Sequence, residues 1–214
     1  IVFINIEIKV QAEVIDGKID WESAKADGVE FAIIRAGYGN GNIDPYAHMN
    51  CVKCNSLGIP IGIYWFSYAY SEEMCRNEAR KAVAFANKHL LELPIYFDFE
   101  YDSEDYAEDH NVNVSRETYC KYVTAFCEEV EKLGYYAAFY VNKDYMLRKT
   151  TQELRDRFDM WLADYDRPVY FNNAHMVQIT DKGTMSGITG YVDLNQTDRD
   201  YPAIIRKAGL NNLK

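Results

Sequence analysis

Two carboxylates one residue apart stand at the end of an apolar run in this sequence. The run is "PIYFDFE", residues 94–100, and its acids are Asp98 and Glu100. Side chains two residues apart on a strand point to the same face, so both acids are expected to project into one space. Two carboxylates that close repel each other, which raises the pKa of one of them. The pair therefore predicts one proton-carrying acid beside one anion, the combination that cleavage of a glycosidic bond requires.

The D-x-E pair alone leaves two other interpretations open. It could help to hold a metal ion, or it could be a pair of surface acids with no part in chemistry. A metal site, with Asp193 as a further ligand, would indicate an α/β barrel that acts on another polymer or on a phosphodiester. The elements that surround the pair are needed to choose among these interpretations.

Strand and helix patterns alternate through the first two-thirds of the sequence. Four short apolar runs, rich in β-branched and aromatic residues, predict strands at 30–39, 60–69, 94–100 and 135–141. Helices are predicted between them, and a capping residue stands at the start of each: Asp20, Asp44, Ser71 and Ser115. This repetition predicts a parallel sheet covered by helices. The acidic stretch 100–115 is predicted to be a long loop.

The spacing of the elements changes in the last third. Three strand-like runs stand too close together for helices between them: 160–165, 175–180 and 190–194. With a further strand in the first ten residues, the sequence predicts a single α/β domain over residues 1–214. We expect a barrel of eight strands and about five helices, with the last three strands joined by loops. The active site of such a barrel lies at the carboxyl ends of its strands, which is where Asp98 and Glu100 stand.

The overall composition argues against some classes of function. A net charge of −10 is unfavourable for binding nucleic acid, whose phosphates require clustered Lys and Arg. No apolar run reaches the ~20 residues that cross a membrane, and the first ten residues lack the pattern of a signal peptide. The five cysteines cannot all pair within one chain, and the CxxC of Cys51 and Cys54 has no second CxxC or His pair beside it. We therefore expect reduced, partly buried thiols and no zinc site.

Several stretches together resemble glycoside hydrolase family 25, the Chalaropsis-type lysozymes. They include "GKIDWESAKADGVEFAIIRAGYGNGNIDPYAHMN" near the start, "LPIYFDFE" around the carboxylate pair, and "GTMSGITGYVDLN" near the end. The stretches occur in the family's order and cover the chain from about Gly17 to Asn195. The resemblance implies a flattened barrel, in agreement with the spacing of the predicted elements.

The resemblance also implies an activity, the hydrolysis of the β-1,4 bond between N-acetylmuramic acid and N-acetylglucosamine in peptidoglycan. Glu100 would then be the general acid that protonates the leaving oxygen. Asp98 would stabilise positive charge at the reacting sugar or orient its 2-acetamido group. The family's late "VDxN" acid falls on Asp193. This chemistry requires no metal or cofactor. The partner would be cell-wall peptidoglycan, with no nucleic acid or membrane involved, and we expect a monomer that is secreted or released by a phage.

Three further residues are candidates for contact with the substrate. Arg35 ends the second predicted strand and could face the cleft as a hydrogen-bond donor, or pair with one of the acids. Tyr64 and Tyr140 lie near the ends of the third and fifth predicted strands. They could pack on a sugar ring or simply fill the core. Each of the three therefore has a structural alternative beside the functional one.

The first strand departs from the family. Members usually carry a "G-[IV]-D-[VI]-S" run there, whose Asp belongs to the catalytic cluster, and a gap-free alignment puts Gln11 at that position. Gln11 could contact substrate, but it cannot carry the charge that balances a developing cation. Glu13 could substitute if the register shifts by two residues. The family's later "WQ" pair is Val177–Gln178 here. The alternative function is therefore a catalytically weakened glycan-binding protein of the same fold.

Overall fold

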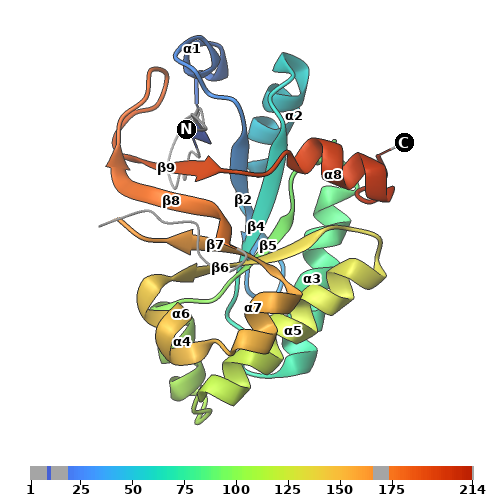
Figure 1. Cartoon of the computed structure of the whole chain (residues 1–214), viewed down its shortest axis with the longest axis vertical. Helices are drawn as coiled ribbons and strands as arrows, with labels where there is room; N and C mark the ends of the chain where they lie inside the picture. Colours follow the sequence, from blue (N-terminus) through green and yellow to red (C-terminus); the bar gives the residue numbers. More distant parts are fainter. Residues whose placement is uncertain (1–8, 11–18, 166–173, 214) are drawn as a thin grey trace, which may run out of the picture.

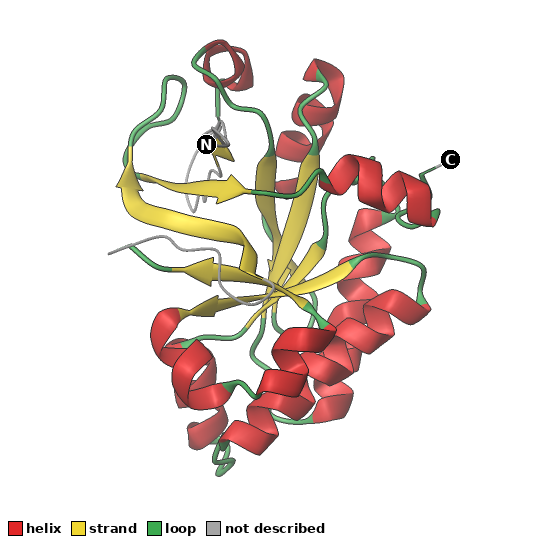
Figure 2. Cartoon of the chain, viewed as in Figure 1, coloured by secondary structure: helices red, strands yellow, loops and turns green. Residues whose placement is uncertain are grey.

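The structure, a computed structural model, describes residues 9–10, 19–165 and 174–213. Within these ranges the chain forms one mixed sheet that curls into a half-barrel (Figure 1). Helices gather along the outer side of the curled sheet (Figure 2). The predicted α/β class is confirmed.

The middle of the sheet is parallel and its edges are antiparallel. The parallel strands are β2 (Ala32–Tyr38), β4 (Ile61–Phe66), β5 (Ile95–Asp98), β6 (Ala137–Asn142), β7 (Asp159–Ala163) and β8 (Ala174–Gly183). The antiparallel strands are β1 (Lys9–Val10), β3 (Asn42–Ile43) and β9 (Val192–Thr197). The order across the sheet is β1-β9-β8-β7-β6-β5-β4-β2-β3. As predicted, β8 and β9 follow each other without a helix between them.

The predicted helices form where the sequence offers capping residues. They are α1 (Trp21–Ala26), α2 (Ala47–Leu57), α3 (Glu72–Ala86) and α5 (Arg116–Lys132). Three of the four expected caps accept a hydrogen bond from the backbone N–H three residues later: Asp20, Ser71 and Ser115. Asp44 instead accepts from the N–H of Tyr46 at 2.9 Å, and α2 begins one residue further on.

The acidic stretch after Glu100 is a helix, α4 (Tyr101–Asp109), so the predicted loop is wrong. The Oγ of Ser103 accepts a hydrogen bond from the backbone N–H of Glu100 at 3.1 Å, which caps the start of this helix. Ser103 and Ala107, one turn apart, are buried. Most of the acids lie on the exposed side of α4. Because acids dominate the composition of this stretch, composition alone gave no sign that two small residues are buried.

Three further helices bring the total in the described ranges to eight, against about five predicted. They are α6 (Lys143–Lys149), α7 (Gln152–Arg157) and α8 (Tyr201–Ala208). The crossover from β6 to β7 thus contains two short helices instead of one. The last helix, α8, directs Tyr201 and Ile205 into the inner side of the curled sheet.

Alternation along the parallel strands separates an outer core from an inner one. On β4, Ile63 and Trp65 pack toward the helices, whereas Tyr64 lies in the inner core. On β5, Phe97 likewise packs toward the helices and Tyr96 lies in the inner core. Large aromatic side chains therefore fill the inside of the half-barrel below the carboxyl ends of its strands.

The amino end of the half-barrel is closed by a polar network around Asp159, the first residue of β7. Its Oδ2 accepts hydrogen bonds from the hydroxyl of Tyr136 at 2.9 Å and from Nη1 of Arg199 at 2.6 Å. The hydroxyl of Tyr201 on α8 donates to the same oxygen at 3.3 Å. These bonds fix α8 against the sheet at the end opposite to the predicted site.

The five cysteines are free thiols, four of them buried. Burial raises the pKa of Cys51 to about 12, so this member of the CxxC pair stays protonated at neutral pH. No helix in the described part of the chain combines the length and the apolar character that crossing a bilayer requires.

Candidate active site

Three side chains form a row toward the carboxyl ends of β4, β5 and β6. Phe66 lies opposite Asp98 across the β4–β5 pair, and Asp98 lies opposite Tyr140 across the β5–β6 pair. Tyr64 and Tyr96, two residues earlier on β4 and β5, belong to the inner core. Because facing alternates along a strand, the row also points inward. It forms part of the wall of a cleft with a volume of about 190 Å³.

Ten residues line this cleft, and they include all three predicted catalytic acids. They are Tyr64, Phe66, Asp98, Glu100, Tyr140, Trp161, Tyr165, Gln178, Asp181 and Asp193. Four of the ten are carboxylates, and none of these described lining residues is Lys, Arg or His. A cleft with this charge favours a substrate that becomes positive as it reacts.

Asp98 is the last residue of β5 and is only 7% exposed. Its backbone carbonyl accepts a hydrogen bond from the N–H of Ser67 at 2.7 Å. This bond extends the β4–β5 pairing one residue past the end of β4. The backbone that carries the Asp98 carboxylate is therefore held by the sheet and not by a free loop.

Glu100 lies beyond the strand, so the expectation that both acids share one strand face is wrong. β5 ends at Asp98, and Glu100 is the residue that precedes α4. Its carbonyl accepts the N–H of Glu104 at 3.0 Å, the first hydrogen bond of the helix. Its side chain nevertheless lines the same cleft as that of Asp98. The direction of the Glu100 side chain is therefore set by the start of α4 and not by β5.

Two tyrosines show how closely the carboxylates are surrounded. Burial raises the pKa of Tyr140 well above its usual value, and the negative charges of Glu100 and Asp98 raise it further. The hydroxyl of Tyr140 is also hydrogen-bonded to Glu100. Burial likewise raises the pKa of Tyr119 on α5, with Asp98 as the next cause. Tyr140 therefore stays protonated and donates its hydrogen bond to the Glu100 carboxylate.

Asp193 reaches the cleft from the antiparallel strand. The sequence predicts a strand at 190–194 with Asp193 near its end, but β9 begins at Val192 and Asp193 is its second residue. Since β9 runs antiparallel to β8, its first residues lie at the same edge as the carboxyl ends of the parallel strands. Asp193 is 8% exposed.

Arg35 is not among the residues that line the cleft. Its Nε and Nη2 lie 3.0 and 2.7 Å from Oδ2 of Asp44, which is 4% exposed. The acid that pairs with Arg35 in this contact is therefore none of the three predicted catalytic acids. The pair ties β2 to the turn that begins α2.

Gln11 and Glu13 lie outside the described residues. The strand just before them, β1, pairs antiparallel with β9, and Val10 stands opposite Leu194. β1 thus lies beside the strand that carries Asp193.

Five lining residues were not among the predicted site residues: Phe66, Trp161, Tyr165, Gln178 and Asp181. Alternation could have identified Phe66, since it follows Tyr64 by two positions on the same strand. Asp181 escaped notice because β8 continues to Gly183, past the predicted strand end at residue 180.

Gln178 is a buried polar residue on the wall of the cleft. It is 3% exposed, yet its Oε1 has no hydrogen-bond partner among the described residues. A buried acceptor without a partner is costly, and an N–H or O–H group of a ligand in the cleft would remove that cost. In the described ranges no group of three or more His, Cys, Asp or Glu side chains is placed to hold a metal ion.

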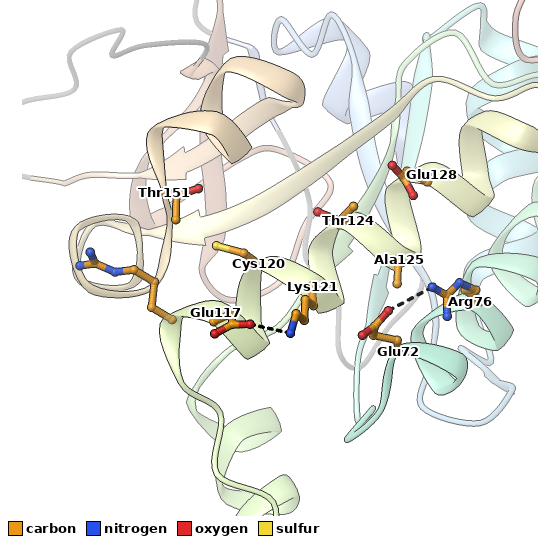
Figure 3. A pocket seen from close by; sticks show the side chains of 10 residues that line it. Glu72, Arg76, Glu117, Cys120, Lys121, Thr124, Ala125, Glu128 and Thr151 are labelled. Atoms are coloured by element: carbon orange, nitrogen blue, oxygen red, sulfur yellow. Dashed lines mark hydrogen bonds and ion pairs between the residues drawn. The ribbon is translucent and has the colours of Figure 1, made fainter.

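A second and larger cavity, of about 470 Å³, lies on the outer helices (Figure 3). Four of its six charged lining residues form two ion pairs: Arg76 with Glu72 at 3.1 Å and Lys121 with Glu117 at 2.6 Å. Each pair lies on successive turns of one helix, α3 or α5. Such exposed pairs stabilise a helix surface slightly and do not by themselves indicate chemistry.

A family model described as glycosyl hydrolases family 25 matches residues 13–188, which is most of the chain. No curated protein matches the chain.

Solved structures share the fold at low sequence identity. The autolysin LytC from Streptococcus pneumoniae, in complex with a synthetic peptidoglycan ligand, is 23% identical with a TM-score of 0.78. That alignment covers 92% of this chain and 47% of the autolysin, so the chain spans about half the length of that relative. A family 25 glycosyl hydrolase from Bacillus anthracis is 22% identical with a TM-score of 0.73, over 93% of this chain and 92% of the other. The lysozyme from Streptomyces coelicolor is 18% identical with a TM-score of 0.75, over 99% and 100%.

Proposed function

Because the chain belongs to glycosyl hydrolases family 25, we propose that it is a peptidoglycan hydrolase that cleaves the β-1,4 bond between N-acetylmuramic acid and N-acetylglucosamine. The observation that carries the proposal is the common cleft of Asp98, Glu100 and Asp193, walled by aromatic side chains. Such a cleft suits a glycan whose reacting sugar becomes cationic. The peptidoglycan ligand bound to the similar pneumococcal autolysin supports this class of substrate.

Glu100 is the general acid of the proposed reaction. It gives its proton to the glycosidic oxygen as the bond to the anomeric carbon breaks, so the leaving sugar departs as a neutral alcohol. The start of α4 and the hydroxyl of Tyr140 hold its carboxyl group in one orientation. An acid held in this manner needs little rearrangement to reach the transition state.

Asp98 is the fixed anion. The 2-acetamido oxygen of the reacting sugar attacks its own anomeric carbon, and the N–H of that group is held by the Asp98 carboxylate. Water then attacks the anomeric carbon and opens the ring that forms, giving a proton back to the Glu100 carboxylate. The general acid is thus regenerated, and the product keeps the configuration of the substrate. The burial of Asp98 strengthens its interaction with the positive charge that develops at the sugar.

Asp193 and Gln178 complete the proposed site from the opposite wall. Asp193 adds a second negative charge close to the reacting sugar. Gln178 offers its Oε1, which has no partner within the described part of the chain, to an N–H or O–H group of the glycan. Tyr64 and Tyr140 border the sugar with aromatic surface.

The alternative is a glycan-binding protein of the same fold that cuts slowly or not at all. Gln11 favours it, since relatives carry an Asp at the aligned position. The two functions share a substrate and differ only in turnover. In both, the partner is cell-wall peptidoglycan, and the protein acts outside the cell that makes it. In both, the protein acts as a monomer. Light scattering after size-exclusion chromatography would test the oligomeric state.

The decisive experiment is a wall-clearing assay followed by mass spectrometry of the products. The proposal predicts falling turbidity that a chelator does not change, with N-acetylmuramic acid at the new reducing ends. Binding to walls without new reducing ends supports the alternative, and loss of activity with chelator indicates a metal-dependent reaction. Glu100→Gln serves as the inactive variant. Glu108→Gln, which changes an exposed acid on the same helix, is the matched control.

A further inference from the structure

A continuous row of aromatic side chains leaves the cleft at Phe66 and runs onto α4. The ring centroids of Phe66 and Tyr68 are 5.2 Å apart, and those of Tyr68 and Tyr106 are 5.1 Å apart. Tyr106 contacts His110 at 4.5 Å. The whole set, which we call the aromatic platform, consists of Tyr38, Phe66, Tyr68, Tyr70, Tyr106 and His110. Phe66 also lines the cleft, so the platform begins inside the candidate site.

Exposure separates the platform from the aromatic core. Tyr38 and Tyr106 are 38% and 39% exposed, whereas Tyr64 and Trp161 in the inner core are 2% and 3% exposed. Exposed aromatic side chains gathered on one surface are typical of a binding site. A tyrosine combines an apolar ring face with a polar tip, which matches the C–H face and the hydroxyl groups of a sugar.

A buried carboxylate holds the middle of the platform from below. Oε1 of Glu78 on α3 accepts a hydrogen bond from the backbone N–H of Tyr68 at 3.1 Å, and Glu78 is 2% exposed. Glu78 is also hydrogen-bonded to the side chain of Ser67, whose Oγ accepts the N–H of Ala69 at 3.1 Å. The loop that carries Tyr68 is therefore fixed before any ligand arrives.

The part of the platform on α4 is fixed as well. Glu104 accepts hydrogen bonds from the hydroxyl of Tyr145 and, at 2.5 Å, from Nζ of Lys149, both on α6. These bonds hold α4 beside α6, where Figure 1 shows the two helices. Both halves of the platform are thus ordered in advance, which lowers the entropy lost when a ligand binds.

We propose that the aromatic platform binds the sugar units that continue the glycan strand beyond the bond held in the cleft. The inference rests on the proposed function, which makes the ligand a polymer. Phe66 joins the two surfaces, and the ring faces of the platform suit packing against the C–H faces of sugar rings. A strand that reaches Tyr106 gains contacts that a short fragment does not. The platform therefore makes the protein select long strands.

Binding to glycan strands of two lengths tests the platform. In the Glu100→Gln background, Tyr106→Ala should weaken binding of a peptidoglycan octasaccharide about three- to tenfold and change binding of a tetrasaccharide less than twofold. Tyr106→Phe keeps the ring and should bind both as the parent does. Leu147→Ala, which removes an exposed apolar side chain on α6 outside the platform, is the control for general surface effects.

Two results overturn the inference. One is an unchanged octasaccharide affinity in Tyr106→Ala, and the other is an equal loss for both lengths. The outcome is separable from the proposed function, because binding is measured without turnover. If the wild type clears walls while Tyr106→Ala shows no dependence on length, the platform fails and the hydrolase stands. If the wild type cuts nothing but Tyr106→Ala loses octasaccharide binding selectively, the platform stands and the hydrolase fails.

Discussion

Asp98 and Tyr140 stand directly opposite each other on neighbouring parallel strands, at the edge where the sheet opens into the cleft. The hydroxyl of Tyr140 is hydrogen-bonded to Glu100, so one side chain adjoins both members of the carboxylate pair. Burial and the two negative charges keep this phenol protonated. Tyr140 therefore links Asp98, at the end of β5, to Glu100, at the start of α4.

Removing the Tyr140 hydroxyl tests that link. Tyr140→Phe keeps the ring against Trp161 but deletes the donor to Glu100. A hydrogen bond to a charged group contributes roughly 1.5–3 kcal/mol, so kcat should fall at least about tenfold with little change in KM. Steady-state kinetics on a soluble glycan measures both constants. A rise in KM at constant kcat would instead indicate that Tyr140 only binds sugar.

Glu100→Gln should abolish wall hydrolysis while the protein stays folded. The amide keeps the shape of the side chain and lacks the proton that the leaving oxygen needs. Turbidity assays measure the loss, and circular dichroism with thermal melting checks the fold. Retention of most of the wild-type rate would remove Glu100 from the acid role.

Asp98→Asn should lower turnover more than it weakens binding. The charge matters most when the sugar becomes cationic, so its loss acts on the transition state more than on the bound substrate. Affinity for glycan fragments is measured beside kcat for the same variant. Losses of equal size in the two quantities would point to a residue that only holds the ligand.

Gln11→Asp should raise the rate by about ten- to a thousandfold if the family alignment of the first strand is correct. An added anion near the site stabilises a cationic transition state by a few kcal/mol at most. If the alignment is correct, the new charge also adds to the repulsion among the existing acids, so the free protein should become slightly less stable. Wall hydrolysis and urea unfolding measure the two effects.

The companion variant Glu13→Gln identifies the working acid of the first strand. An unchanged rate in Gln11→Asp together with loss of activity in Glu13→Gln would assign that role to Glu13. No effect from either change would exclude the first strand from the chemistry.

The buried carboxylate of Glu78 predicts a pH dependence of stability. Burial raises its pKa from 4.5 to about 7. The folded state therefore holds the proton more strongly than the unfolded state, and stability falls as pH rises from about 4.5 through 7. Its contribution is on the order of 3 kcal/mol across that range.

Urea unfolding at pH 5 and pH 8 measures this effect against a matched variant. Glu78→Gln does not ionise and still offers an oxygen to the N–H of Tyr68. The difference in unfolding free energy between the two pH values should therefore shrink in the variant. The same pH dependence in both proteins would show that Glu78 does not cause it.

The fold was largely predictable because its elements have local signals. Apolar runs bounded by turn residues marked the parallel strands, and Asp20, Ser71 and Ser115 marked the helix starts. α4 was not predictable from composition, since most of its acids are exposed and only Ser103 and Ala107 are buried. Reciprocal hydrogen bonds between Glu100 and Ser103 cap its start, and acid content does not reveal such bonds.

Site residues could be predicted from the sequence only where the residue type itself indicates a chemical role. Asp98, Glu100 and Asp193 could be named from the sequence, and all three line one cleft. The pairing of Arg35 with Asp44 could not be predicted from the sequence. The two residues are brought together by the turn that precedes α2, and the sequence alone does not show which acid an arginine will meet. Gln178 is an ordinary polar residue until the structure shows that its Oε1 is buried without a partner in the described ranges.

The pairing of β1 with β9 brings residues 9–10 against 194–195 and sets an order of events during synthesis. During translation Asp98 and Glu100 emerge from the ribosome long before Asp181 and Asp193, yet all four line one cleft. Nascent chains that stop before β9 lack one wall and the partner strand of β1. Because domains fold as units once their last elements emerge, the cleft forms only after nearly all of these residues have left the ribosome. Truncated products of interrupted translation thus carry the acid pair without the enclosure that would let it act.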